Sequence, residues 1–184
     1  MTSTVTPKST TSVDGRDLIL TRTIDATPEK VFRAWTDPVL LKEWFTPKPW
    51  TTAHIETDVR PGGSTRFVMR SPEGTEFPNT GVYLEVVPNR RLVFTDAYSK
   101  AWEPSEKPFM TVIITLEDLG DGRTGYTALV RHWSIADREA HEKMGFHEGC
   151  NLRGAACGGG GGLVRREFRP KRLEPAYIRQ VRQG

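Results

Sequence analysis

A single helical stretch, residues 134–149, follows a long series of strand-like runs and then breaks off. Ser134 stands at a helix N-cap position and Asp137 follows three residues later, a capping-box arrangement. The residues after it are mostly good helix formers. From Cys150 onward the chain is rich in glycine and arginine and has no apolar stripe of helical period. We therefore expect a sheet that is completed first and covered last by this helix.

The runs before the helix alternate apolar and polar residues, which is typical of half-buried strands. Turn residues such as Pro61-Gly62-Gly63 and Gly120-Asp121-Gly122 separate them. Because most of the turns are short, the strands should form an antiparallel meander. The expected strands are residues 17–25, 51–59, 64–71, 80–87, 91–98, 109–118 and 124–133.

Two short helices are expected between the first and second strands. Thr27 is a suitable N-cap for the first helix, and Pro28 follows at N1, where a missing N–H is tolerated. Asp37-Pro38 ends that helix and starts the next, so the pair should form a V. The fold class is therefore α+β, with an antiparallel sheet of about seven strands and a C-terminal helix that is truncated or altered near residue 150.

The formal net charge of +3 is unevenly distributed. Residues 150–184 carry eight basic and two acidic side chains, so residues 1–149 are net negative. The folded part therefore offers no basic platform for nucleic acid. We expect no membrane insertion, because no run approaches the ~18 apolar residues of a spanning helix. The Ser/Thr-rich residues 1–16 lack the apolar core of a secretory signal, so they are predicted to be a disordered lead-in of a cytoplasmic protein.

The segments IDATPEKVFRAWTDPVLLKEWF and SIADREAHEKMGFHEG, with the strand runs between them, resemble the family homologous to the activator of the heat-shock-protein-90 ATPase. This AHSA-type family belongs to the START/polyketide-cyclase-like (SRPBCC) superfamily, which has the helix-grip fold. The resemblance covers residues 17–149. It implies a seven-stranded antiparallel sheet around a long C-terminal helix, with a cavity between them. A shared fold does not by itself choose a function.

The chain departs from the family after Gly149, where members continue through a Gly-Trp pair into several more helical turns. Gly, Ala, Arg and Pro are the residues that GC-rich DNA encodes when it is read out of frame. One hypothesis is that residues 150–184 are a frameshift product, and the other is an unusual natural extension. The nucleotide sequence decides between them, since only a frameshift leaves an amphipathic helix in another frame. A shortened helix uncovers apolar surface, which the tail, a ligand or a second subunit of a homodimer would cover.

The sequence offers little sign of catalysis or of metal binding. His141 and His147 are six apart, about 240° around a helix, so they do not share a face. There is no GxSxG motif and no cysteine before Cys150. His132 can contact a ligand or can be a satisfied structural histidine, and Arg66 can hold an anionic group or lie in water. We expect no metal, no cofactor and no defined catalysis.

Aromatic and sulfur-containing side chains along the strands and in the last helix are the candidate cavity lining. A mostly apolar wall with a few polar groups is typical of a small-molecule site, although a packed core uses the same residues. We therefore predict a binding protein for a hydrophobic small molecule. The alternatives are a module that modulates a chaperone ATPase, or a polyketide-cyclase-like or hydrolase-like enzyme. The predicted lining is Phe67, Met69, Tyr83, Phe94, Trp102, Phe109, Trp133 and Phe146, with His132 and Arg66 as polar contacts.

Overall fold

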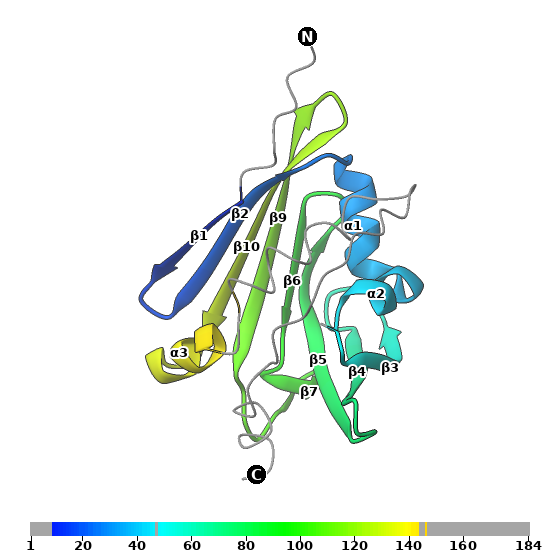
Figure 1. The fold of residues 1–184 in the computed structure, drawn as a ribbon, viewed down its shortest axis with the longest axis vertical. Coiled ribbons are helices and arrows are strands. Elements are labelled where there is room, and N and C mark those ends of the chain that lie inside the picture. Colours follow the sequence, from blue (N-terminus) through cyan, green and yellow to red (C-terminus); the bar gives the residue numbers. More distant parts are fainter. Residues whose placement is uncertain (1–8, 47, 144–145, 147–184) are drawn as a thin grey trace.

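The computed structural model describes residues 9–46, 48–143 and 146, and about half of these form one antiparallel sheet (Figure 1). The fold class is α+β, as the sequence predicts. In chain order the elements are β1 (Ser9–Asp14), β2 (Asp17–Ile24), α1 (Pro28–Thr36), α2 (Pro38–Trp44), β3 (Thr51–Thr57), β4 (Ser64–Arg70), β5 (Glu76–Val87), β6 (Arg91–Thr95), β7 (Tyr98–Lys100), β8 (Glu103–Pro104), β9 (Met110–Gly120), β10 (Arg123–His132) and α3 (Ile135–Lys143).

The main sheet has eight strands in the order β1-β2-β10-β9-β6-β5-β4-β3, one more than predicted. From β3 to β10 it is the expected meander, interrupted only by the small β7–β8 hairpin. The N-terminal strand β2 then pairs with β10, the last strand of the chain. This pairing leaves β1 and β3 as the two edges.

The additional strand β1 corrects the prediction that residues 1–16 are disordered. Residues Ser9–Asp14 pair in register with β2, from Ser9 opposite Arg22 to Asp14 opposite Asp17. Gly15 completes the turn between them with a φ of 54°, a conformation that glycine adopts without steric cost. The rest of the lead-in up to Lys8 lies outside the described residues.

Helix α1 begins and ends, and helix α2 begins, where the sequence predicts. The Thr27 side chain accepts a hydrogen bond from the N–H of Lys30, and Pro28 occupies the first turn. Asp37 joins the two helices: its N–H donates to the carbonyl of Arg33, and its carboxylate accepts from the N–H of Val39. One residue therefore caps both helices and fixes the angle between them.

The core lies on one face of the sheet, which we call the inner face. Trp35 of α1 lies against Phe94 and Tyr126 of this face, with ring centroids 6.1 and 6.5 Å away. Phe45, directly after α2, contacts Phe67 at 4.6 Å. Residues of β2, β6, β9 and β10 that point the same way form the buried cluster, among them Leu18, Leu20, Leu92, Val112, Ile114, Ala128 and Val130.

Helix α3 lies at the end of β2 and β10, away from α1 and α2 (Figure 1). Ser134 caps it as predicted, because its hydroxyl accepts from the N–H of Asp137 at 3.1 Å. None of the residues Ile135–Lys143 is buried. The predicted tail of residues 150–184, and with it the frameshift hypothesis, lies outside the described residues.

Candidate functional site

An aromatic and apolar wall runs across the inner face from β4 to β6. Strand register brings it together: Tyr83 lies opposite Phe94, and the two rings are 6.2 Å apart. Phe67 and Met69 continue the wall on β4, where they lie opposite Asn79 and Phe77. These four side chains were all predicted to line a cavity, and the structure brings them to one face. Their role as a cavity lining remains a prediction.

Tyr83 supplies a neutral hydroxyl to this wall. Its side chain is buried, and burial raises the pKa of its phenol to about 12 even though a hydrogen bond with Thr65 acts in the opposite direction. The phenol is therefore protonated throughout the physiological range. It can contribute a polar contact to a ligand without adding a charge.

The opposite end of the inner face is polar and lies beside α3. The imidazole of His132 is buried there, with Nδ1 3.0 Å from the carbonyl oxygen of Arg16 and Nε2 2.8 Å from Nδ1 of His141. A carbonyl can only accept, so Nδ1 of His132 carries the proton and Nε2 accepts from His141. Phe109 packs against both rings at 5.3 and 5.7 Å.

Burial holds the pKa of His132 below its ordinary value, against the hydrogen bond that it donates to the Arg16 carbonyl and the charges of Asp137 and Asp17. The ring is thus neutral at neutral pH, which agrees with the hydrogen-bond assignment. His132 is a satisfied histidine on β10, and His141 is its partner from α3. Of the two interpretations open for His132, the structure supports the structural one.

Asp96 is a further acidic group at the same end. Its carboxylate accepts from the N–H groups of Phe109 and Met110 at 3.0–3.1 Å. Burial nevertheless raises its pKa, and the two backbone hydrogen bonds oppose the shift. Its main role is to fasten the connection after β8 to the end of β6. Asp96 is not among the predicted site residues, although an acidic residue that directly follows an apolar strand is a visible signal.

Three of the predicted site residues lie elsewhere. Trp102 is 82% exposed in the turn between β7 and β8, where its ring contacts Tyr98 at 6.2 Å, so the prediction that it lines an inner cavity is wrong. Trp133 follows the last strand and is 53% exposed. Arg66 alternates with Phe67 on β4 and therefore projects from the outer face. It cannot contact a ligand bound at the inner face.

The remaining two predicted residues gather at the polar end. Phe109 contacts the histidine pair, as described above. Phe146 is buried in the main cluster, and its ring lies 5.4 Å from that of His141. Phe146, which follows α3 in the chain, therefore packs in the core.

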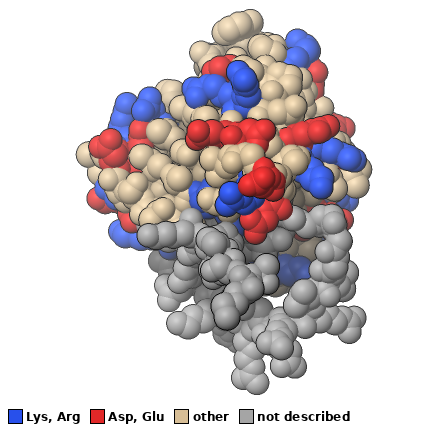
Figure 2. Space-filling view, turned by 90° about the horizontal axis from the view of Figure 1, so that it is seen from above, with Lys and Arg blue, Asp and Glu red and all other residues tan. Residues whose placement is uncertain are grey.

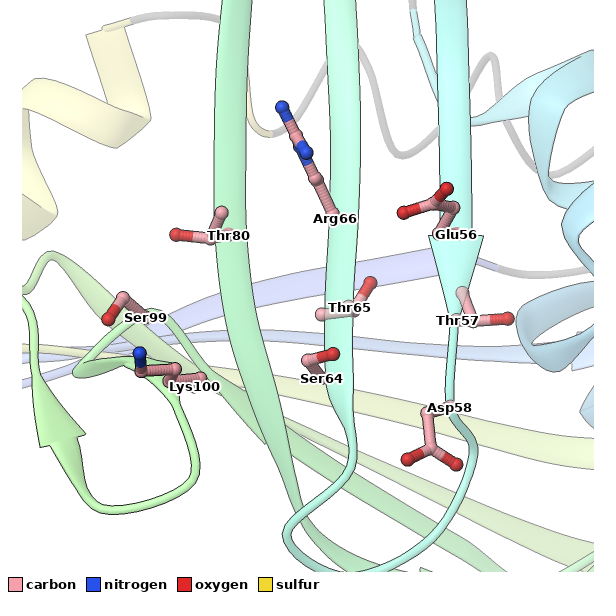
Figure 3. Close-up of a pocket in the computed structure, with 9 residues that line it drawn as sticks. All are labelled: Glu56, Thr57, Asp58, Ser64, Thr65, Arg66, Thr80, Ser99 and Lys100. Carbon is pink, nitrogen blue, oxygen red and sulfur yellow. The ribbon is translucent and has the colours of Figure 1, made fainter.

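A separate depression of about 280 Å³ lies on the outer face (Figure 3). Its charged groups are mostly paired with neighbours: Glu56 with His54 at 3.0 Å, Asp58 with Arg60 at 2.8 Å, and Lys100 with Glu103 at 2.9 Å. Paired charges of both signs give no strong field toward one kind of ligand. The lining residues are Glu56, Thr57, Asp58, Ser64, Thr65, Arg66, Thr80, Ser99 and Lys100.

Acidic and basic side chains are intermixed on the face drawn in Figure 2. Within the part of the chain that the structure describes, no group of three or more His, Cys, Asp and Glu residues is placed to hold a metal ion. None of the described helices combines the length and the apolar character needed to cross a bilayer.

A model of the family described as "Activator of Hsp90 ATPase homolog 1-like protein" matches residues 25–153. A solved structure of a protein from Nitrosomonas europaea is 41% identical, covers 79% of this chain and 94% of its own, and superposes with a TM-score of 0.74. A protein from Chromobacterium violaceum is 26% identical over 76% and 95% of the two chains, with a TM-score of 0.61. A Mycobacterium smegmatis protein, 21% identical over 82% and 93% with a TM-score of 0.66, shows the fold alone. No curated protein matches the chain.

Proposed function

The chain belongs to the Activator of Hsp90 ATPase homolog 1-like family, and from this premise we propose that it binds a hydrophobic small molecule against the inner face of its sheet. The family places it among ligand-binding or interaction domains. The finer assignment rests on the inner face itself. We place this binding role in the cytoplasm, as the sequence predicts.

The observation that carries the proposal is an apolar surface that is only partly covered. Val112 and Ile114 are buried in the centre of the sheet, whereas Val86, Phe94 and Met110 on the same face remain partly exposed. Each Å² of apolar surface removed from water contributes roughly 25 cal/mol. A ligand that covers these side chains would therefore gain binding energy from them.

The described helices leave this surface between them. Among the described residues, helix α1 packs mainly against β9 and β10 and reaches Phe94 of β6 through Trp35, α2 packs against β3, and α3 packs mainly against β10 and β2 at their far end. The partly exposed residues belong to β5, β6 and β9, between these helices in the sheet order. Tyr83 and the polar end at His132 border them. An apolar wall with a few polar groups at its margin is the usual composition of a small-molecule site.

Binding of the neutral fluorophore N-phenyl-1-naphthylamine tests the proposal. Met110→Gln makes the partly exposed apolar wall polar, and Phe94→Leu reshapes it while keeping it apolar. Val39→Gln is the matched control, because Val39 is 71% exposed on α2. We expect Met110→Gln to weaken binding about tenfold, Phe94→Leu to change it less and Val39→Gln to leave it unchanged; tenfold corresponds to about 1.4 kcal/mol. Circular dichroism checks that each variant is folded. Absence of binding by the unaltered chain, or equal loss in Met110→Gln and Val39→Gln, would overturn the proposal.

The alternative functions give different results in the same set of experiments. A module that modulates a chaperone ATPase, as the family description suggests, would change the ATPase rate of the chaperone whether or not the fluorophore site is intact. A cyclase or hydrolase would convert an added substrate. A homodimer that covers the inner face would show fluorophore binding that weakens as the protein concentration rises.

A further inference from the structure

One charged residue interrupts the apolar side of β2. Leu18, Leu20 and Ile24 are buried on the inner face, and Arg22 follows the same alternation. Arg22 lies directly opposite Tyr126 of β10. Since Tyr126 stacks on Trp35 of α1, the Arg22 side chain leaves the sheet on the inner side.

Arg22 forms no ion pair with any described residue, unlike most of the arginines in the described part of the chain. Arg33, Arg60, Arg70, Arg91, Arg123, Arg131 and Arg138 all have a carboxylate within 4.0 Å. The Nε atom of Arg22 is also buried and has no hydrogen-bond acceptor. A buried guanidinium N–H without an acceptor is uncommon, because proteins normally satisfy such donors.

A second unsatisfied polar atom lies across the strand pair. Ser9 of β1 is the direct partner of Arg22, and its hydroxyl oxygen is likewise buried without a hydrogen bond. Side chains of direct partners leave the same face of a sheet, with Cβ atoms about 5 Å apart. Both groups can donate. One oxyanion placed between them would therefore accept from Arg22 and Ser9 together.

We propose that Arg22 and Ser9 form an anion-recognition point on the inner face, and that the ligand is an amphipathic carboxylic acid. This inference rests on the proposed function and names its ligand class. A carboxylate matches the planar edge of a guanidinium and can form two parallel hydrogen bonds with it. A single guanidinium balances a single negative charge, which favours a carboxylate over a doubly charged phosphate.

The position of Arg22 also sets the shape of the ligand. The partly exposed Met110 and Phe94 lie on β9 and β6, two and three strands from β2. Leu116 is the residue of β9 level with Arg22, and Val112, opposite Phe94, and Met110 lie four and six residues further along that strand. With strands about 4.8 Å apart and about 3.4 Å per residue along them, the apolar body must reach roughly 20 Å from its head group. An extended acyl chain fits this requirement, whereas a compact aromatic acid is too short to reach from Arg22 to Met110 and Phe94.

Titration with palmitate and with its neutral methyl ester at pH 7.5 tests the inference, because the two share one apolar body. We expect the folded chain to bind palmitate at least tenfold more tightly than the ester. Arg22→Gln should remove this preference and leave ester binding unchanged, and Arg22→Lys should retain part of it. Ser9→Ala should reduce the preference by a smaller factor. Arg66→Gln is the matched control, since Arg66 also lacks an ion pair among the described residues but lies on the outer face.

The outcomes separate the inference from the proposed function. Equal binding of acid and ester by the unaltered chain would overturn the recognition point while leaving a hydrophobic site. An equal loss of preference in Arg22→Gln and Arg66→Gln would also overturn it, because general charge would then explain the preference. If neither palmitate, its ester nor the neutral fluorophore binds, the proposed function itself is overturned. If Arg22→Gln does not fold, the Arg22→Lys and Ser9→Ala results decide.

Discussion

The Nε2 atom of His132 and the Nδ1 atom of His141 lie 2.8 Å apart, which joins the last strand of the sheet to the helix that follows it. Helix α3 has no buried residue of its own between Ile135 and Lys143. Polar contacts, together with Phe109 against both imidazoles, therefore contribute much of its attachment.

The first prediction concerns the pH dependence of stability. Burial holds the pKa of His132 below its usual 6.5 in the folded chain, so the unfolded chain binds more protons when the pH falls through this range. The contribution of neutral His132 is complete above pH 6.5 and is lost as the pH falls below it. Asp137, Asp17 and Arg138 modify the shift without reversing it. We expect the urea concentration at the unfolding midpoint to be lower at pH 5.5 than at pH 7.5.

His132→Gln should make this pH dependence weaker. The variant loses the hydrogen bond to the Arg16 carbonyl, so it should be about 1 kcal/mol less stable at pH 7.5. His54→Gln is the control, because His54 is half-exposed on β3 and pairs only with Glu56. If the stability of His132→Gln falls with pH as steeply as that of the unaltered chain, groups other than His132 cause the loss of stability at low pH.

The second prediction compares two tryptophans in edge-to-face contact at 4.6 Å. The indole N–H of Trp44 donates to the carbonyl of Ala34 at 3.1 Å, whereas that of Trp35 is buried with no acceptor. Trp44→Phe loses a hydrogen bond, and Trp35→Phe removes an unsatisfied donor. We expect Trp44→Phe to be the more destabilising by about 2 kcal/mol in urea unfolding. Equal losses of stability in the two variants would mean that the smaller ring, and not the hydrogen bond, determines the effect of both substitutions.

The third prediction concerns the turn between β3 and β4. A Cβ atom at Gly63 would overlap the carbonyl oxygen of Asp58, and the Gly63 N–H donates to the carbonyl oxygen of Arg60 at 2.8 Å. Gly63→Ala should therefore cost about 2–3 kcal/mol. At Gly125 of β10 the nearest atom to such a Cβ is 3.5 Å away, so Gly125→Ala should change stability by less than about 1 kcal/mol. Thermal unfolding of both variants provides the comparison, and similar melting temperatures would contradict it.

The fourth prediction contrasts two ion pairs. Arg131 contacts the Asp17 carboxylate with Nε and Nη2 at 2.7–3.2 Å, and the Asp17 side chain is only 12% exposed. Asp17→Asn should cost about 1–2 kcal/mol, since the pair is bidentate and partly buried. In the pair Arg70–Glu76 both side chains are half-exposed, so Glu76→Gln should cost under about 1 kcal/mol. High salt should reduce the difference between the stability losses of the two variants only slightly. If this difference disappears at 1 M NaCl, both ion pairs act through screened charge alone.

Much of the fold follows from local patterns. Turn glycines and prolines delimit β3, β4 and β10 within a few residues, and Thr27, Asp37 and Ser134 cap the helices as their side chains predict. Strand β1 escaped prediction because Val13 is the one apolar residue among Ser9–Asp14. Its place in the sheet depends on pairing with β2 rather than on its own alternation.

The candidate site is less visible in the sequence because it depends on which face of the sheet is covered. Alternation separates Phe67 from Arg66, but only the contact with Phe45 identifies the inner side. The alternation of β2 also places Arg22 among buried leucines, and this signal went unused. The contact of His132 with His141 depends on the turn at Trp133 and Ser134, which residue spacing does not specify.

The pairing of β2 with β10 has a consequence for the order in which the protein is made. Asp17 and Arg131, which meet in this pair, are 114 positions apart in the chain. At roughly 5–20 residues per second, the ribosome needs about 6–23 s between them. During this interval the hairpin β1–β2 exposes the apolar side of Leu18 and Leu20 with no sheet to join. Contacts of such long sequence separation also slow refolding. A nascent chain halted before β10 should thus be a substrate for holdase chaperones, and one halted well beyond it should not.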